Sequence, residues 1–375
     1  MNEVYDPVRK TFFGRITNEN EKYGETPLSA VFITRIMWTF AASYRIFPNV
    51  KYKKMADEAF RILLENFWDN ENGGIYWSVL PNGKKLDTKK QFYAQAFFIY
   101  ALSEYYLAFQ SEKAKQIAVS MFLLIEKYAW DIEFGGYVEA CTVNWSEIKD
   151  QRLSLRDLNV KKSMNTHLHL LEAYTNFYRV YKNQLVKKQL KNLVHIFLER
   201  IIDRKTGHLN LYFDTDWKVH SGIVSYGHDI EYTWLLNKAV EVLGEKELIG
   251  AVESIVMKSA EIIAKEGVAK HGGLYYEKKG EKLMEQFHWW PQAEAVVGFF
   301  SAWQISKNKN YLQLSLNGWE FIQQNIIDKK NAEWFLGVDK NLEPLHIDKI
   351  NEWKAPYHNS RMCLEMICRI SSLVD

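Results

Sequence analysis

The chain of 375 residues has only three cysteines, and this scarcity excludes two kinds of architecture. Cys141, Cys363 and Cys368 are odd in number, and no two of them have the CxxC spacing of a zinc ribbon. Neither a disulfide framework nor a zinc ribbon is therefore expected. Free thiols are typical of proteins in a reducing compartment, so we expect a cytoplasmic location.

An excess of charge of one sign is lacking as well. The 48 Lys and Arg residues nearly balance the 46 Asp and Glu residues. A protein that binds nucleic acid usually has a clear excess of positive charge. No run of about 18 uninterrupted apolar residues occurs, and the opening stretch MNEVYDPVRKTFFGRITNENEKYG contains no apolar segment. We expect a soluble protein with neither nucleic acid nor a membrane as its partner.

Four common catalytic motifs are missing. The chain contains no GxxxxGK[ST], no GxGxxG after a strand, no GxSxG and no HExxH. ATP chemistry, hydride transfer on a dinucleotide-binding fold, serine hydrolysis and zincin proteolysis therefore lack the residues that usually carry them.

Helix-breaking residues are scarce, whereas aromatic residues are abundant. There are 19 Gly and 7 Pro against 13 Trp, 21 Tyr and 21 Phe, and aromatic residues make up 15% of the chain. Apolar residues recur at helical spacing in many segments, and with a further helix in about 3–20 we predict about twelve helices. The other segments are 28–46, 51–67, 90–109, 111–129, 163–184, 185–202, 225–243, 246–266, 289–306, 308–327 and 357–374.

Short and long linkers alternate between these segments. The long linkers share a turn cluster followed by a short aromatic or β-branched stretch, which predicts a loop carrying a small strand. They span 67–79, 129–140, 201–213, 270–280 and 326–339, and an Asp recurs in them at 69, 131, 203 and 328. A period near 62 residues with two helices per unit indicates a repeat architecture.

Six helical hairpins in a ring would form an (α/α)6 barrel with short β-hairpins in the long loops at one end. We predict this all-α fold as a single domain over 1–375, with an open solenoid of hairpins as the alternative. In such a barrel, polar residues in the first turns of the inner helices would surround a pocket.

Three segments place histidines near predicted helix starts. His228 and Glu231 are three residues apart on one helix face, where a carboxylate can orient an imidazole for general base catalysis. His358 follows Pro356 at the head of the last helix, and Asn165 and His169 share a face of another. Each could instead be a surface or capping residue.

The segment EQFHWWPQAEAVVGFFSAW has the most concentrated signal. Trp289 and Trp290 precede Pro291 at a predicted helix entry, and Glu294 follows. Two adjacent tryptophans are often core packing, but beside a pocket their flat faces suit the C–H faces of a pyranose ring. Trp353 would extend that surface.

Three polar residues lie on otherwise apolar helices. They are Tyr93, Gln95 and Arg35, and Arg35 needs a partner if it is buried. His169, His228, Glu231 and His358 could together form a metal site, although no spacing requires one. We expect no metal and no other cofactor.

Five separated motifs resemble the N-acylglucosamine 2-epimerase superfamily. They are GHDIEYTWLL, HWWPQAEAVVGFF, EWFLGVD, EWKAPYHNSRMCLEM and KSMNTHLHLLEAY, and the resemblance covers nearly the whole chain. WWPQAEAVVG and EWKAPYHNSRMCLE are most similar to the branch that acts on β-1,4-linked disaccharides. Ala355 stands where that branch has Cys.

The resemblance implies an (α/α)6 barrel and cofactor-independent epimerisation at C2 of the reducing-end sugar of a disaccharide substrate. It implies that His228 and His358 are the acid/base residues and that Glu231 supports them. The positions that hold the sugar correspond to Arg35, Tyr93, Asn165, His169, Trp290, Glu294 and Trp353, with Trp289 as a neighbour in the same motif. We expect a monomer.

Three alternatives remain open. Another branch of the superfamily, an N-acylglucosamine epimerase or a mannose isomerase, would use the same H-x-x-E element. A glycoside hydrolase on an (α/α)6 barrel would use Glu231 and Glu294 as its two carboxylates. A non-catalytic sugar-binding repeat protein would leave the histidines without a role.

Overall fold

The computed structural model describes residues 4–220 and 222–373, and this part of the chain is mostly helical. It contains α1 Ala30–Ile46, α2 Val50–Ile62, α3 Phe92–Phe109, α4 Glu112–Tyr128, α5 Met164–Val180, α6 Gln184–Ile196, α7 Tyr226–Leu243, α8 Lys246–Glu266, α9 Trp289–Ser306, α10 Lys309–Phe321 and α11 His358–Ser371. π-Helical turns at Leu63–Phe67, Phe197–Ile201 and Ile322–Ile326 follow α2, α6 and α10. Eleven of the predicted helices are thus confirmed within these residues, and the π turns account for the ends of three predicted ranges.

The predicted helix in about 3–20 is wrong for residues 4–20, and residue 3 lies outside the described residues. This segment forms β1 Tyr5–Asp6, β2 Thr11–Phe12 and β3 Arg15–Ile16. Asp6 precedes a proline, which disfavours the helical conformation. Its Oδ1 accepts the backbone N–H of Val8 at 3.0 Å and of Arg9 at 3.2 Å, so the chain turns instead and β1 pairs with β2.

The structure divides the chain into two compact units. Unit 1 comprises Met1–Leu193, Tyr212–Val219 and Ile350–Tyr357, and unit 2 comprises Val194–Leu211, His220–Lys349 and His358–Asp375. A closed barrel in a single domain therefore stays a prediction. None of the helices in residues 4–220 and 222–373 combines the length and apolar character needed to cross a bilayer.

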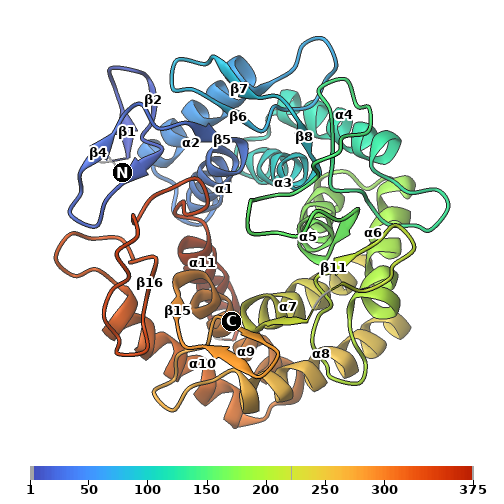
Figure 1. Ribbon diagram of the computed structural model, residues 1–375, viewed down its shortest axis with the longest axis vertical. Helices are drawn as coiled ribbons and strands as arrows, with labels where there is room; N and C mark the ends of the chain where they lie inside the picture. The colour runs from blue at the N-terminus through green and yellow to red at the C-terminus, as the bar shows by residue number, and fades with distance from the viewer. Residues whose placement is uncertain (1–3, 221, 374–375) are drawn as a thin grey trace. The chain divides into compact units, whose positions relative to one another are not determined.

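In unit 1, α3 packs between α1 and α5, while α2 covers α1 and α4 covers α3 (Figure 1). The sequence explains this order, because α3 is apolar around its whole circumference, whereas α2 buries a single face. The remaining strands of the unit are short and antiparallel. They are β4 Lys22–Tyr23, β5 Leu28–Ser29, β6 Ser78–Val79, β7 Lys85–Asp87, β8 Lys90–Gln91, β9 Ala140–Cys141, β10 Lys162–Ser163 and β11 Tyr212–Phe213.

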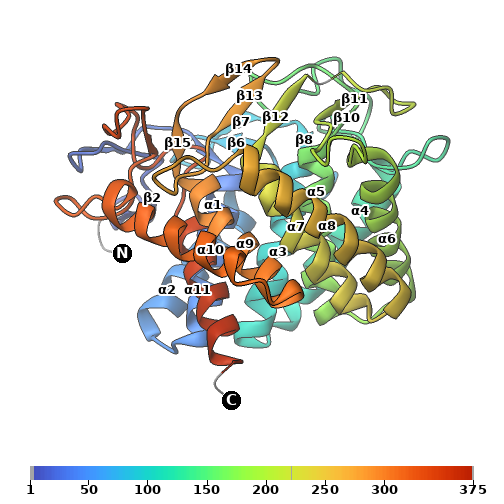
Figure 2. The ribbon, with the colours of Figure 1, turned by 90° about the horizontal axis from the view of Figure 1, so that it is seen from below.

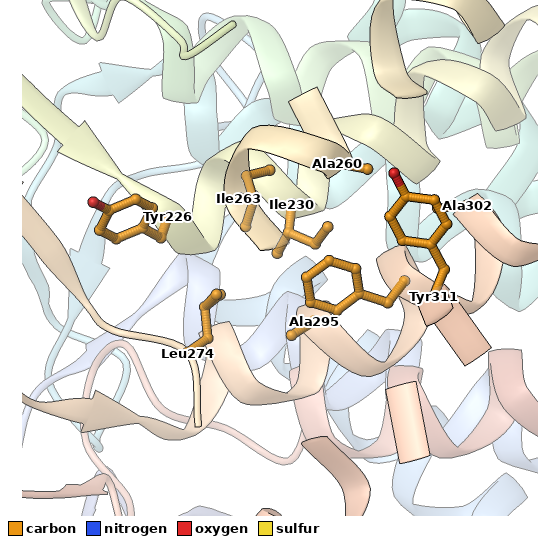
Figure 3. Packing of buried hydrophobic residues seen from close by; sticks show 9 residues of the cluster. Tyr226, Ile230, Ala260, Ile263, Leu274, Ala295, Ala302 and Tyr311 are labelled. Carbon is orange, nitrogen blue, oxygen red and sulfur yellow. The ribbon is translucent and has the colours of Figure 1, made fainter. Parts of the chain in front are cut away.

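In unit 2, α7 and α9 pack against each other, α8 covers α7, and α10 and α11 both pack on α9. Figure 3 shows the apolar cluster formed by Tyr226, Ile230, Ala260, Ile263, Leu274, Ala295, Phe299, Ala302 and Tyr311. Gly298 permits the close approach of α7 and α9, because a Cβ there would lie 2.5 Å from Cγ1 of Ile230.

Among the strands of unit 2, β12 and β13 contact α7, whereas β15 contacts α9 (Figure 2). They are β12 Ile223–Ser225, β13 Glu277–Lys279, β14 Lys282–Met284, β15 Phe287–His288 and β16 Gly337–Val338. β12, β13 and β14 form an antiparallel sheet, and β15 pairs with β16. Each long linker identified in the sequence thus contributes a small strand.

The recurring aspartates fold these loops in the same way. Each donates its backbone N–H to a carbonyl five residues further on and accepts nearby backbone N–H groups with its side chain. After the loops of Asp69, Asp131 and Asp203, the fourth residue of the next helix (α3, α5 or α7) then binds the loop backbone. The fourth residue of α9 does the same in the loop at Leu274, which lacks such an Asp. These residues are Gln95, His167, Asp229 and Gln292.

His167 illustrates a purely structural histidine. Burial lowers the pKa of its imidazole to about 4, so the ring is neutral. Nδ1–H donates to the carbonyl of Ser163 at 2.6 Å, and Nε2 accepts the backbone N–H of Tyr137 at 2.9 Å. Both ring nitrogens are therefore used to hold a loop.

Candidate active site

Seven of the eleven predicted site residues occupy equivalent positions in alternate helices. α1, α3, α5, α7 and α9 begin at residues 30, 92, 164, 226 and 289, at intervals of 62, 72, 62 and 63. Their sixth residues are Arg35, Phe97, His169, Glu231 and Glu294, and the second residues of α3, α5 and α9 are Tyr93, Asn165 and Trp290. Positions two and six share a helix face, so the repeat presents polar groups from the same face of each helix.

In unit 2, His358 is held by a buried carboxylate. Nδ1 of His358 lies 2.7 Å from Oε1 of Glu294, and both side chains are buried. Oε1 of Glu294 also accepts Nη2 of Arg361 at 2.7 Å. Oε2 of the same carboxylate accepts the indole N–H of Trp234 at 3.0 Å. With these donors converging on it, Glu294 is held as an acceptor for the imidazole N–H.

Arg361 links the two glutamates of this cluster. Its Nη2 lies 2.5 Å from Oε1 of Glu231 as well as 2.7 Å from Glu294, and each of the three side chains is 1% exposed. One buried guanidinium thus hydrogen-bonds two buried carboxylates and offsets part of their negative charge. The guanidinium also lies 4.9 Å from the ring centroid of Trp234, which supports it from the side.

Three of these groups have the ligand atoms of a possible metal site. Glu231, Glu294 and His358 each offer one atom within 4.8 Å of the others. Arg361, however, already brings positive charge to both carboxylates. The two carboxylates thus share a guanidinium as their cationic partner, and the absence of a metal stays a prediction.

His228 lies at the third position of α7 and has different partners. Its Nδ1 is 2.8 Å from the hydroxyl of Ser225, the residue before the helix. A hydroxyl can donate or accept, so this contact suits both the neutral and the protonated imidazole. The pairing of His228 with Glu231 on one helix face stays a prediction, and the contacts described for Glu231 join it to Arg361.

Trp290 lies beside both histidines. Its ring centroid is 4.7 Å from that of His228 and 5.8 Å from that of His358. The indole is half-buried, whereas the neighbouring Trp289 is buried and lies 6.2 Å from His358 in an edge-on arrangement. Trp289 therefore packs in the interior, as one prediction had it, whereas the indole of Trp290 is partly accessible, as a sugar-binding face requires.

Unit 1 brings together the other predicted residues around Arg35. Its guanidinium is buried and donates through Nη2 to the hydroxyl of Tyr93 at 3.0 Å and through Nη1 to the carbonyl of Trp353 at 2.6 Å. The cation also lies 4.6 Å from the ring centroid of Phe97. The partners that a buried arginine requires are thus confirmed.

His169 lies against the same aromatic groups. Its ring is 4.8 Å from Tyr93 and 4.7 Å from Phe97, and Nδ1 is 2.9 Å from Oε2 of Glu172. One turn earlier on α5, the buried Oδ1 of Asn165 has no hydrogen-bond partner within the described residues. An unsatisfied acceptor of this kind is available to a ligand hydroxyl.

The sequence reasoning missed several groups that complete the two clusters. They are Ser225, Trp234, Arg361, Glu172 and Tyr357. Arg361 is the fourth residue of α11 and Glu172 is three residues after His169. The rule that picked out polar residues in first helical turns would have found Arg361, and the helical spacing would have found Glu172.

The chain matches the family model described as N-acylglucosamine 2-epimerase (GlcNAc 2-epimerase) over residues 11–361. It is 44% identical over 371 residues to cellobiose 2-epimerase of Bacteroides fragilis, covering 98% of this chain and 94% of that one. The cellobiose 2-epimerase of Dictyoglomus turgidum is 37% identical, with 92% and 88% covered. The solved structure of the Bacillus thermoamylovorans cellobiose 2-epimerase superimposes with a TM-score of 0.95 at 34% identity, covering 98% of this chain and 95% of that chain.

Proposed function

The chain belongs to the N-acylglucosamine 2-epimerase family, and we propose that it inverts C2 of the reducing-end glucose of cellobiose to give glucosylmannose. The name of the relatives at 44% and 37% identity supports cellobiose as the substrate. We extend the proposal to other β-1,4-linked disaccharides with a reducing-end glucose, so that lactose would give epilactose. The observation that carries the proposal is the contact of one half-buried indole, Trp290, with two histidines.

The reaction begins with opening of the pyranose ring, because the C2 proton is acidic only beside a free aldehyde at C1. A histidine can move the proton from O1 to O5 in that step. A base then removes the C2 proton and leaves a cis-enediolate, and a second acid returns a proton to the opposite face of C2. No electrons are gained or lost overall, so the chemistry requires no redox cofactor.

The contacts of His358 define which nitrogen acts. Glu294 accepts Nδ1–H, so the neutral ring carries its lone pair on Nε2. The same carboxylate stabilises the imidazolium that forms when Nε2 takes the C2 proton. His228, whose Nδ1 is paired with a hydroxyl that can reverse its role, is suited to alternate between acid and base.

The remaining predicted residues are assigned to the sugar. Trp290 offers a flat face to the C–H groups of the pyranose. Arg35, Tyr93, His169 and Asn165 supply donors and acceptors for hydroxyl groups, and a donor among them would stabilise the negative oxygen of the enediolate. Trp353 lies near Trp77 and Tyr93, with ring centroids 6.0 and 6.5 Å away, and adds an aromatic surface.

Hydrolysis is the less favoured activity. A glycosidase needs one carboxyl group that stays protonated as the general acid. Glu231 and Glu294 both accept hydrogen bonds from Arg361, and a neighbouring cation favours the ionised carboxylate. Isomerisation is a closer possibility, since the same enediolate protonated at C1 gives a ketose.

Cellobiose incubated with the protein in D2O tests the proposal. We expect glucosylmannose with deuterium at C2 of the reducing-end residue, followed by NMR. Product without deuterium at C2 would contradict an enediolate that exchanges with solvent, and free glucose would indicate hydrolysis. Parallel incubations with mannobiose, mannose and N-acetylglucosamine separate the branches of the family, and a ketose product would identify isomerisation.

A further inference from the structure

Glu172 is a buried carboxylate that the proposed reaction does not use directly. It lies on α5, three residues after His169, and is 4% exposed. Its Oε2 is 2.9 Å from Nδ1 of His169, and its Oε1 accepts the hydroxyl of Tyr357 at 2.7 Å. A buried carboxylate that receives a donor on each oxygen is held ionised and in a fixed position.

The pairing with Glu172 determines which ring nitrogen of His169 carries a hydrogen. An ionised carboxylate only accepts, so His169 presents Nδ1–H to it and keeps Nε2 for another partner. Within the described residues, Nε2 of His169 has no hydrogen-bond partner. The second nitrogen of a buried ring, held by a carboxylate on the first, is thus left for a ligand.

Other groups around the ring favour a ligand oxygen there. Tyr93 from α3 contacts His169, and its hydroxyl accepts Nη2 of Arg35 from α1. Asn165, one turn before His169, has an unsatisfied buried Oδ1. The charged or titratable groups near the ring are therefore Glu172, Tyr93, Arg35 and Tyr357, and Glu172 is the one anionic partner described for it.

We propose that Glu172 is a positioning residue for the epimerisation: it holds the Nδ1–H group of His169, so that Nε2 of the fixed ring hydrogen-bonds a sugar oxygen. The catalytic consequence rests on the proposed function, whereas the pairing of Glu172 with His169 does not. A sugar hydroxyl that passes its proton to Nε2 leaves an N–H group there, and this donor would stabilise the negative oxygen of the enediolate.

The test compares the wild-type protein with Glu172→Gln, which keeps the shape and a carbonyl acceptor but removes the charge. We expect the Nδ1–H proton resonance of His169, followed by ¹H and ¹⁵N NMR of the ring, to move upfield, because a hydrogen bond to a neutral acceptor is weaker than one to a carboxylate. The His208 ring, which is paired through Nδ1 with Asp229 at 2.7 Å, is the internal control and should keep its Nδ1–H resonance. His169→Gln identifies the resonance.

Turnover provides the second readout. We expect Glu172→Gln to lower kcat on cellobiose about tenfold or more with a smaller change in KM, because the lost interaction strengthens in the transition state. An unchanged Nδ1–H resonance of His169, or a shifted resonance with unchanged kcat, would overturn the positioning role. If Glu172→Gln does not fold, Glu172→Asp keeps the charge but draws it back by one methylene, and its Nδ1–H resonance should lie upfield of that in the wild type. The NMR measurement needs no turnover, so absence of epimerase activity in the wild-type protein would count against the proposed function alone.

Discussion

His358 and Glu294 are joined through Nδ1 and Oε1 at 2.7 Å, although 64 residues separate them in the chain. This contact orients the imidazole and leaves Nε2 as its basic atom. It therefore joins Glu294 to a histidine that we propose as an acid/base residue.

Replacing either histidine should separate proton exchange from epimerisation. We expect His228→Ala and His358→Ala each to lower epimerisation by about two to four orders of magnitude, since each loses one acid/base group. In D2O, each variant should retain slow exchange of the C2 proton for one epimer only, and the two variants should act on opposite epimers. A variant with a nearly normal rate would remove that histidine from the chemistry; circular dichroism checks the fold.

Arg361 should be essential to stability as well as to activity. Arg361→Met leaves Glu231 and Glu294 buried without their shared cation, and removing one partner of a buried ion cluster costs about 3–5 kcal/mol. Urea unfolding measures this loss. Arg361→Lys restores the charge without the planar fork and should recover part of the stability. Equal stability of the Met variant and the wild type would contradict the bridging role.

Gly227 should be required for the position of Trp290. A Cβ at Gly227 would lie 2.5 Å from Cη2 of Trp290, so Gly227→Ala must shift the indole away from its contact with His228. We expect kcat/KM to fall about tenfold to a hundredfold. Gly250→Ala is the matched control, because that helical glycine is exposed and a Cβ there would meet open space; it should keep activity and gain up to about 1 kcal/mol.

Lys90, which binds Asp69 in the first of the long loops, should contribute far more to the free energy of unfolding than a lysine in a surface ion pair. Nζ of Lys90 lies 2.8 Å from Asp69 with side chains 0% and 1% exposed, whereas Lys53 lies 2.7 Å from Asp57 with 46% and 41% exposed. Lys90→Met should lower the free energy of unfolding by about 3–5 kcal/mol. Lys53→Met should cost at most about 1 kcal/mol. If the two variants lost similar amounts of unfolding free energy, burial would not be the reason for the strength of the Lys90–Asp69 pair.

Glu139 should make stability depend on pH near neutrality. Burial raises the pKa of its carboxyl to about 7 from 4.5, against hydrogen bonds from Thr166 and Ser163 that lower it. The protonated form is thus favoured by folding, so its stabilising effect is present below about pH 4.5 and is lost as the pH rises through 7. A shift of this size corresponds to roughly 3 kcal/mol.

Glu139→Gln removes this titration. Relative to the wild type, the variant should gain free energy of unfolding as the pH rises from about 5 to 8, measured by urea unfolding at each pH. Parallel pH profiles for the two proteins would show that the pKa of Glu139 is the same in the folded and unfolded states.

Much of the local structure follows from the sequence. Helix α9 could be placed at residues 289–306 and α8 at 246–266 because apolar periodicity acts over neighbouring turns of the same helix. The recurring loops were visible for the same reason, since each Asp binds backbone groups only a few residues away. The strands near residues 5–16 were missed, because Asp6 and Pro7 set a turn that an apolar pattern does not reveal.

The partners within the site depend on the packing of separate helices. Helical spacing pairs His228 with Glu231, whereas the fold brings Arg361 to Glu231 across 130 residues and Ser225 to His228. Spacing along one helix determines which side chains share a face, so the order of residues was enough to predict which polar side chains lie together on a helix. Which buried charge meets which partner depends on contacts between distant parts of the chain, and these exist only once the chain has folded.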